Sequence, residues 1–210
     1  MRRRLKWTLA VPLTLLLIAA TSACGDDEAA VASPFQDCST LTAPPSAAPS
    51  AAALPAAAPS ASAAVGGSGA TVVDLPDLEL SCFTGGDKIA LRDVRGPAVI
   101  NIWASWCLPC RTELPVMQAL ADKAAGRVTV VGVDSKDDRG KGAEFAGDKD
   151  VRMPTLFDED GKLLNGLGRI NLPVTVFLDA AGRAYVHPLP LDASGLSEQL
   201  RKYTGVAVAP

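Results

Sequence analysis

Two cysteines, Cys107 and Cys110, are separated by two residues near the middle of the chain. An apolar run over residues 98–103 precedes them, and a helical pattern extends from about Cys107 to Ala125. A cysteine at the start of a helix meets backbone N–H groups without partners and the positive end of the helix dipole. Both features favour the thiolate, which is the form that attacks disulfides. Cys110 would lie one turn further on the same helix face, so the pair could close and reopen a small disulfide.

Two other interpretations of this pair are weaker. A zinc site needs four ligands, but the chain has a single histidine, His187, and no second CxxC motif. A purely structural disulfide is the remaining alternative. The position of the pair between a strand and a helix therefore favours redox chemistry.

The N-terminus has the pattern of an export signal. Basic residues at 1–6 precede an apolar stretch over residues 7–20, which is too short for a membrane span. We therefore expect a signal peptide at 1–23 and a protein that works outside the cytoplasm. The small residues before Cys24 are typical of a lipoprotein signal, so we expect Cys24 to be lipidated and to anchor the chain at the extracytoplasmic face of the cell membrane. Thr21 replaces the usual leucine of that signal, which leaves ordinary cleavage after Ala23 as the alternative.

The next segment, residues 24–70, is dominated by alanine, proline, serine and glycine. Few of these residues can bury apolar area, so we expect a disordered tether that is partly extended by its prolines. Residues 71–210 are long enough for one domain with a real core. No cluster of basic residues occurs in that domain, so nucleic acid is excluded as an expected partner, and nothing in the sequence indicates a cofactor.

Strand and helix patterns alternate in the expected domain, which predicts an α/β fold with a central mixed sheet flanked by helices. A hairpin is expected around Gly85-Gly86. The expected strands are 78–83, 88–91, 98–104, 128–133, 174–178 and 183–187, and the expected helices are 107–125, 138–147 and 194–203.

Four blocks of the chain are similar to one known family. Gly96-Pro97, Asn101 to Cys107, Cys110 to Pro115, and Leu172 to Thr175 together resemble the TlpA/ResA family of exported thioredoxin-like reductases. The resemblance covers roughly residues 75–204. It implies a thioredoxin-like fold with an N-terminal β-hairpin and an insertion before the last two strands, and it implies thiol–disulfide oxidoreductase activity.

The family pattern implies roles for the central residues. Cys107 is expected to attack as the thiolate, and Cys110 is expected to resolve the mixed disulfide. Trp106 and Pro109 either shape the rim of the site or serve ordinary packing. Glu113 corresponds to a family glutamate that lies near the cysteines and shifts their pKa values, although a solvated glutamate in the first helical turn is the plain alternative.

The family pattern also implies a role for one proline. Pro173 resembles the cis-proline that faces the CxxC pair and holds Leu172 in position to pair with an extended substrate. Pro154, in Met-Pro-Thr, has a similar local sequence, but Pro173 is favoured because a strand, a glycine turn and another strand follow it directly.

The chain departs from relatives at two places. Asn101 stands where cytoplasmic thioredoxins have a buried aspartate as proton acceptor, as is usual in the exported family, so that role must come from elsewhere or from water. Leu108-Pro109 differs from the dipeptides of relatives, so their redox potentials cannot be transferred to this chain. We expect no catalytic duty for His187.

Two further cysteines, Cys38 and Cys82, remain in the mature chain. Idle thiols are rare in exported proteins, so we expect a structural disulfide that pins the distal tether onto the hairpin. Two buried or intermolecular thiols are one alternative. Electron transfer to Cys107 is another, which requires proximity.

The expected function is a membrane-tethered reductant of exported protein disulfides, such as that of apocytochrome c in cytochrome c maturation, supplied with electrons by a membrane thiol–disulfide reductase. An oxidase that installs disulfides is the alternative within the same chemistry, and the reduction potential separates the two. A lipoprotein adaptor with a structural CxxC is the alternative of another class. A peroxidase of the peroxiredoxin type is disfavoured, because it would use one cysteine in a proline-rich loop upstream of the helix.

Overall fold

The computed structural model describes residues 33–42, 71–124 and 126–208, which all belong to one unit, residues 31–210. The expected signal peptide at 1–23, the expected lipidation site Cys24 and most of the expected tether lie outside the described residues.

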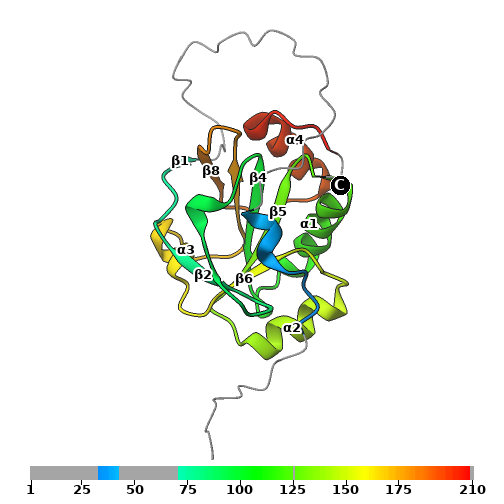
Figure 1. Ribbon diagram of the computed structural model, residues 1–210. Helices are drawn as coiled ribbons and strands as arrows, with labels where there is room; N and C mark the ends of the chain where they lie inside the picture. The colour runs from blue at the N-terminus through cyan, green and yellow to red at the C-terminus, as the bar shows by residue number, and fades with distance from the viewer. Residues whose placement is uncertain (1–32, 43–70, 125, 209–210) are drawn as a thin grey trace, which may run out of the picture. The chain divides into compact units, whose positions relative to one another are not determined.

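An eight-stranded mixed sheet forms the centre of this unit, in the order β1-β8-β7-β4-β5-β6-β2-β3 (Figure 1). The strands are β1 Thr71–Val73, β2 Glu79–Cys82, β3 Lys88–Ala90, β4 Ala98–Trp103, β5 Thr129–Ser135, β6 Thr155–Asp158, β7 Val174–Leu178 and β8 Ala184–His187. The central strands β4, β5 and β6 run parallel, whereas the other neighbours pair antiparallel. Every residue of β4 is buried, because helices cover both of its faces.

The described helices lie on the two faces of this sheet (Figure 1). They are the 3₁₀ helices η1 Cys38–Leu41 and η2 Leu91–Asp93 and the α-helices α1 Cys110–Ala124, α2 Arg139–Asp148, α3 Lys162–Gly166 and α4 Ala193–Thr204. One apolar cluster joins α1, α2 and α4 to the face of β4 that carries Val99 and Trp103. A second cluster joins η1, η2 and α3 to the face that carries Ile100 and Ile102.

Helix α1 packs with the helical spacing expected from the sequence. Leu114, Met117, Leu120 and Ala124 are all buried against the sheet. Pro115 lies inside the helix on its exposed side, where the loss of one backbone hydrogen bond leaves the buried stripe intact.

The expected N-terminal hairpin is present. Strands β2 and β3 pair antiparallel, and the turn between them uses Gly85 and Gly86 at φ angles of 90° and 89°. Such positive φ values are readily adopted only by glycine. The segment between β5 and β7 contributes α2, β6 and α3, and β6 extends the sheet by pairing with both β5 and β2.

Part of the expected tether is packed on the domain. Residues 33–42 include the buried Phe35, Cys38 and Leu41, and the ring centroid of Phe35 lies 4.7 Å from that of Phe83. Residues 33–42, which the sequence assigns to the expected tether, belong to the same unit as the expected domain. The alanine- and proline-rich composition around them predicts a tether, although Phe35, Cys38 and Leu41 have apolar area that the domain buries.

Candidate functional site

The two central cysteines lie where β4 ends and α1 begins. Their sulfur atoms are 2.04 Å apart and their Cα atoms 5.3 Å apart, as in a disulfide. Helix α1 begins at Cys110 rather than at about Cys107 as expected, so Cys107 stands three residues before the first helical residue. The backbone N–H of Cys110 points at Cys107 Sγ over 3.3 Å. The first N–H of α1 thus donates to the sulfur that the sequence predicts to be the nucleophile.

Two exposed apolar side chains flank Cys107 in the sequence. Cys107 is 3% exposed and Cys110 is fully buried, so only the first sulfur lies near the surface. Trp106 and Leu108, on either side of Cys107, are 57% and 76% exposed. A disulfide partner would therefore meet an apolar rim before it reaches Cys107.

Glu113 is not a solvated helix residue. Its side chain is almost fully buried, and it shares a helix face with Cys110, three residues earlier. Burial raises the pKa of the Glu113 carboxyl to about 7, although hydrogen bonds from Leu191, Asn101 and Thr175 act in the opposite direction. A carboxyl with a pKa near neutrality can both accept and release a proton at physiological pH.

Three elements supply the hydrogen bonds around this carboxyl. The backbone N–H of Leu191, after β8, donates to Glu113 Oε1 over 3.0 Å. The side-chain amide of Asn101, in β4, donates to Glu113 Oε2 and to Thr175 Oγ1 over 3.2 Å each. The amide of Asn101 cannot act as an acid or a base. Its hydrogen bond orients the Glu113 carboxyl instead. Sequence reasoning missed Leu191 and Thr175, because no local signal marks contacts from β7 and the loop after β8.

The peptide bond between Leu172 and Pro173 is cis, and Pro173 comes directly before β7. The cis bonds in the described part of the chain do not include the one before Pro154. Leu172 packs against the apolar cluster that contains Cys107 and Cys110. These positions agree with the favoured choice of Pro173, whose role toward a substrate stays a proposal.

The sulfur atoms of Cys38 and Cys82 also lie within bonding distance, 1.94 Å, with their Cα atoms 5.9 Å apart. Both residues are 2% exposed. They belong to the apolar cluster on the opposite face of the sheet from Cys107 and Cys110. The arrangement gives no support to direct electron transfer between the two pairs.

A second buried acid, missed by sequence reasoning, lies at the end of β5. Asp134 is fully buried, and neither carboxyl oxygen has a hydrogen-bond partner among the described residues. Burial, followed by repulsion from Asp137, raises the pKa of Asp134 to about 9, so the carboxyl is neutral at pH 7. Because no contact joins Asp134 to either cysteine, we give it no part in the exchange chemistry.

His187 ends β8 and is 7% exposed. Burial lowers its pKa, and the positive charge of Lys202 acts in the same direction. Its Nδ1 has no partner in the described part of the chain. Nothing here gives it a role in the chemistry at Cys107.

The loop after β5 contacts the residues just before Cys107, which the sequence did not reveal. Asp137 accepts hydrogen bonds from the backbone N–H and the hydroxyl of Ser105, and the carbonyl of Lys136 accepts one from the indole of Trp106.

Within residues 33–42, 71–124 and 126–208, no helix has the length and apolar character needed to cross a bilayer.

Comparison with known proteins supports the resemblance noted in the sequence. A family model described as the AhpC/TSA family matches residues 73–185. The thiol:disulfide interchange protein DsbE of Pseudomonas fluorescens biotype C is 36% identical over 109 residues, which are 51% of this chain and 60% of that relative. The thiol-disulfide oxidoreductase ResA of Bacillus thuringiensis subsp. konkukian is 29% identical over 120 residues, 56% of this chain and 68% of the relative.

Solved structures give the same result for the fold. A structure of MTB dsbF in mixed oxidised and reduced forms superposes with a TM-score of 0.57 at 27% identity, and it covers 63% of this chain and 98% of that one. The expected thioredoxin-like fold, with a mixed sheet flanked by helices, is confirmed.

Proposed function

Because the chain belongs to the AhpC/TSA family, we propose that it is a thiol–disulfide oxidoreductase whose Cys107–Cys110 pair exchanges electrons with disulfides of other proteins. The observation that carries this proposal is the bonded pair at the start of α1, with a helix N–H directed at Cys107 Sγ and a buried carboxyl one turn further on. The relatives that match are named as thiol:disulfide interchange proteins and oxidoreductases, which supports the same chemistry.

The exchange proceeds through one mixed disulfide. In the reduced protein, the Cys107 thiolate attacks one sulfur of the client disulfide, and the other client sulfur leaves as a thiolate. The Cys110 thiol then gives up its proton and attacks Cys107 Sγ, which releases the second client sulfur as a thiolate. The client gains two electrons and ends as two thiolates, which take up protons from water, while the Cys107–Cys110 disulfide forms and the proton of Cys110 is released.

Glu113 is the side chain suited to take the proton from Cys110. It shares a helix face with that cysteine, and its pKa of about 7 lets it both take up and release a proton at neutral pH. The hydrogen bonds from Asn101 and Leu191 keep the carboxyl oriented while it does so.

We place the protein at the extracytoplasmic face of the membrane as a reductant. The proposal rests on the export pattern of residues 1–23, the lipoprotein-like Cys24 and the names of the matching relatives. Its clients are exported proteins with disulfides, such as apocytochrome c, and a membrane thiol–disulfide reductase restores its dithiol. The disulfide-forming oxidase remains the alternative within the same chemistry.

Two measurements test the proposal. Purified protein is equilibrated with glutathione buffers of known potential, and the Cys107–Cys110 pair is followed by alkylation and mass analysis. Reduced protein is then mixed with a disulfide-bonded peptide, and the formation of peptide thiols is followed. A potential near that of thioredoxin, about −270 mV, supports the reductant, whereas one near −120 mV supports the oxidase. Absence of any exchange leaves the adaptor with a structural CxxC.

A further inference from the structure

Three residues, Ala104, Ser105 and Trp106, connect the end of β4 to Cys107, and the loop after β5 holds the last two of them. The hydroxyl of Ser105 donates to Asp137 Oδ1 over 2.9 Å, and the backbone N–H of Ser105 donates to Asp137 Oδ2. The indole N–H of Trp106 donates to the carbonyl of Lys136 over 2.9 Å. The guanidinium of Arg111 in α1 also donates to the carbonyl of Ser105 over 3.5 Å.

Both oxygens of the Asp137 carboxylate accept hydrogen bonds. Besides the two donors of Ser105, it accepts the backbone N–H of Asp138 at Oδ1 over 2.9 Å. An ionised carboxylate has two oxygens and no donor, so it can serve three N–H and O–H groups at once. An asparagine offers one acceptor oxygen, and its NH₂ group would face a donor. The site therefore requires a carboxylate rather than any polar group of similar shape.

Lys136 has an unusual backbone conformation that the fold maintains. Its φ is 56°, in the left-handed region that non-glycine residues rarely adopt. Such residues persist where the surroundings fix them. The N–H of Lys136 donates to the carbonyl of Asp158 over 3.0 Å, and its ammonium donates to Asn165 in α3 over 3.1 Å. A side-chain Cβ at Gly161 would lie 2.2 Å from Lys136 Cε, so the glycine leaves room for the lysine stem.

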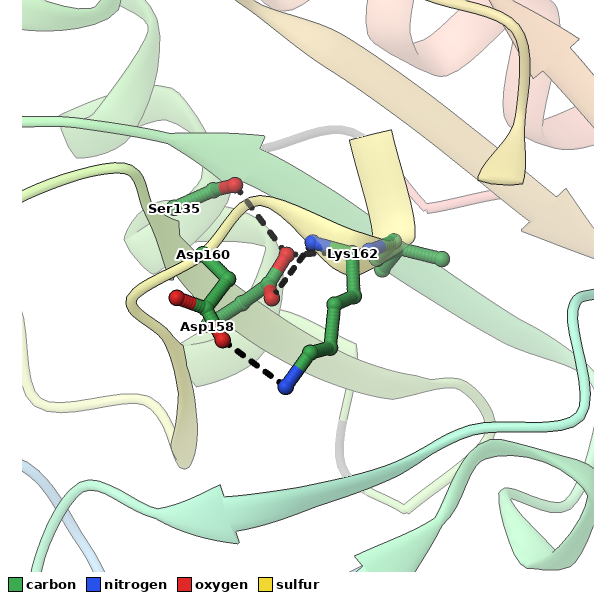
Figure 2. A network of polar contacts seen from close by, with 5 residues as sticks. Ser135, Asp158, Asp160 and Lys162 are labelled. Carbon is green, nitrogen blue, oxygen red and sulfur yellow. Dashed lines mark hydrogen bonds and ion pairs between the residues drawn. The ribbon is translucent and has the colours of Figure 1, made fainter. Parts of the chain in front are cut away.

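Asp158, whose carbonyl accepts the N–H of Lys136, is the centre of the polar network shown in Figure 2. The carboxylate of Asp158 accepts a hydrogen bond from Ser135 Oγ over 3.1 Å and caps the start of α3 through the backbone N–H groups of Lys162 and Leu163. Lys162 also pairs with Asp160 at the surface. The end of β5 is thereby fixed to the start of α3, directly before the residues that hold Ser105 and Trp106.

We propose that Asp137 is a positioning residue for the exchange reaction, which fixes Ser105 and so places Cys107 Sγ against the first N–H of α1. This inference rests on the proposed function for its consequence, but its structural part concerns the reactivity of Cys107 alone. The carbonyl of Lys136 fixes the next residue, Trp106, from the same loop. Release of Ser105 would let Cys107 move away from the helix N-terminus that stabilises its thiolate.

Positioning and simple electrostatics predict opposite results for Asp137→Asn. Loss of a nearby negative charge alone would lower the pKa of the Cys107 thiol and speed its attack at neutral pH. Loss of positioning would raise that pKa and slow attack. We expect the second result, with attack on a small aromatic disulfide slowed about tenfold or more, since small misplacements of reacting groups carry penalties of this size.

The matched control is Asp138→Asn, which removes the same charge one residue later. Asp138 caps α2 by accepting the N–H of Lys141 over 3.0 Å, and asparagine is an equally good N-cap. We expect this variant to react within about twofold of the wild type. A thiolate absorbance titration of the reduced proteins gives the Cys107 pKa, and a stopped-flow reaction with the small disulfide gives the rate.

A second variant tests the same contact in case Asp137→Asn fails to fold. Ser105→Ala removes only the hydroxyl and leaves the backbone N–H in place, so we expect a smaller decrease in rate. The double variant should be no slower than Asp137→Asn alone, because both changes act through one contact.

The outcomes separate this inference from the proposed function. A lowered Cys107 pKa with unchanged or faster attack in Asp137→Asn, or equal behaviour of Asp137→Asn and Asp138→Asn, overturns the positioning role. A wild-type protein that reacts with the small disulfide but never reduces a protein disulfide overturns the proposed function and leaves the positioning role standing.

Discussion

The carboxylate of Glu113 in α1 accepts a hydrogen bond from the backbone N–H of Leu191, 78 residues later in the chain. The contact joins the helix that carries Cys110 to the loop between β8 and α4. A buried N–H needs an acceptor, so the loop depends on the glutamate, and the glutamate is held at the level of the cysteines by the loop. The buried Glu113 carboxyl thus stabilises the loop between β8 and α4, and it lies on the same helix face as Cys110.

We predict that Glu113→Gln lowers the apparent pKa of the cysteine pair and slows exchange about tenfold at neutral pH. The ionised carboxylate opposes a second negative charge on Cys110, and the glutamine carries neither that charge nor a transferable proton. Because the thiols and the carboxyl are coupled, the measured values belong to the cluster. A thiolate titration beside peptide-disulfide reduction provides the test, with the exposed Glu144→Gln as control. Identical titrations and rates for the two variants would contradict the role.

The same carboxyl makes folding stability depend on pH. Its pKa is about 7 in the folded protein, against the ordinary value of 4.5 for a glutamate, so the folded state holds the extra proton between these two pH values. The stability of the wild type therefore falls relative to Glu113→Gln as pH rises from 4.5 to 7, by about 3 kcal/mol, and changes no further above that. Urea unfolding of the oxidised proteins at pH 5 and pH 8 measures the difference. A gap that stays constant, or that widens in favour of the wild type, would show that burial does not govern this carboxyl.

We predict opposite phenotypes for the two central cysteines. Cys107→Ser should abolish exchange, because Cys107 is the sulfur near the surface and the one that faces the helix N–H. Cys110→Ser should trap clients as mixed disulfides with Cys107, because no thiol remains to resolve the first intermediate. Non-reducing electrophoresis after mixing with a disulfide-bonded protein reads out both. Trapping by Cys107→Ser and not by Cys110→Ser would reverse the assignment.

The central part of the fold follows from local patterns. Strands β4 and β7 are apolar runs, and helix α1 has apolar residues at helical spacing. The CxxC pair lies where β4 ends and α1 begins. The hairpin was predictable because Gly85 and Gly86 carry its turn. These elements needed no information from distant residues.

Other elements left no comparable signal. Strand β1 has three residues at the sheet edge, with Val72 exposed, and α3 has five residues after a turn at Gly161. Short elements of this kind are set by tertiary pairing rather than by periodicity. The site contacts are also non-local, since Ser105 and Asp137 are 32 residues apart and meet only because β4 and β5 pair in parallel. Cys107, Cys110 and Glu113 could therefore be proposed from the sequence, whereas their supports could not.

We predict that the mature chain begins at a lipidated Cys24. The small residues before Cys24 are typical of a lipoprotein signal, and a diacylated cysteine would hold the domain at the membrane. Intact-mass analysis of the membrane fraction measures the acyl addition, and Cys24→Ala serves as the comparison, which should move the protein to the soluble fraction. A soluble wild-type chain that starts at or after residue 24 without acyl mass would exclude the anchor.

We predict that Cys38–Cys82 is a structural bridge that survives conditions in which Cys107–Cys110 is reduced. Both of its sulfurs are buried on the face of the sheet opposite the apolar rim, and the bridge closes a loop with a sequence separation of 44. It also keeps residues 33–42 on the domain, where Phe35 packs within 6.2 Å of the Trp103 ring, measured between centroids. Differential alkylation at controlled potential should show Cys107 and Cys110 labelled first.

Removal of this bridge should affect stability far more than chemistry. For the double variant Cys38→Ala/Cys82→Ala we expect a loss of about 2–4 kcal/mol in the free energy of unfolding, because the unfolded chain regains the freedom of the long loop. The rate of peptide-disulfide reduction should stay within about twofold of the wild type, since the bridge lies in a separate apolar cluster from the active pair. Urea unfolding and the exchange assay are compared on the same preparations. A large loss of exchange with unchanged stability would mean that Cys38 and Cys82 take part in electron transfer and are not a structural bridge.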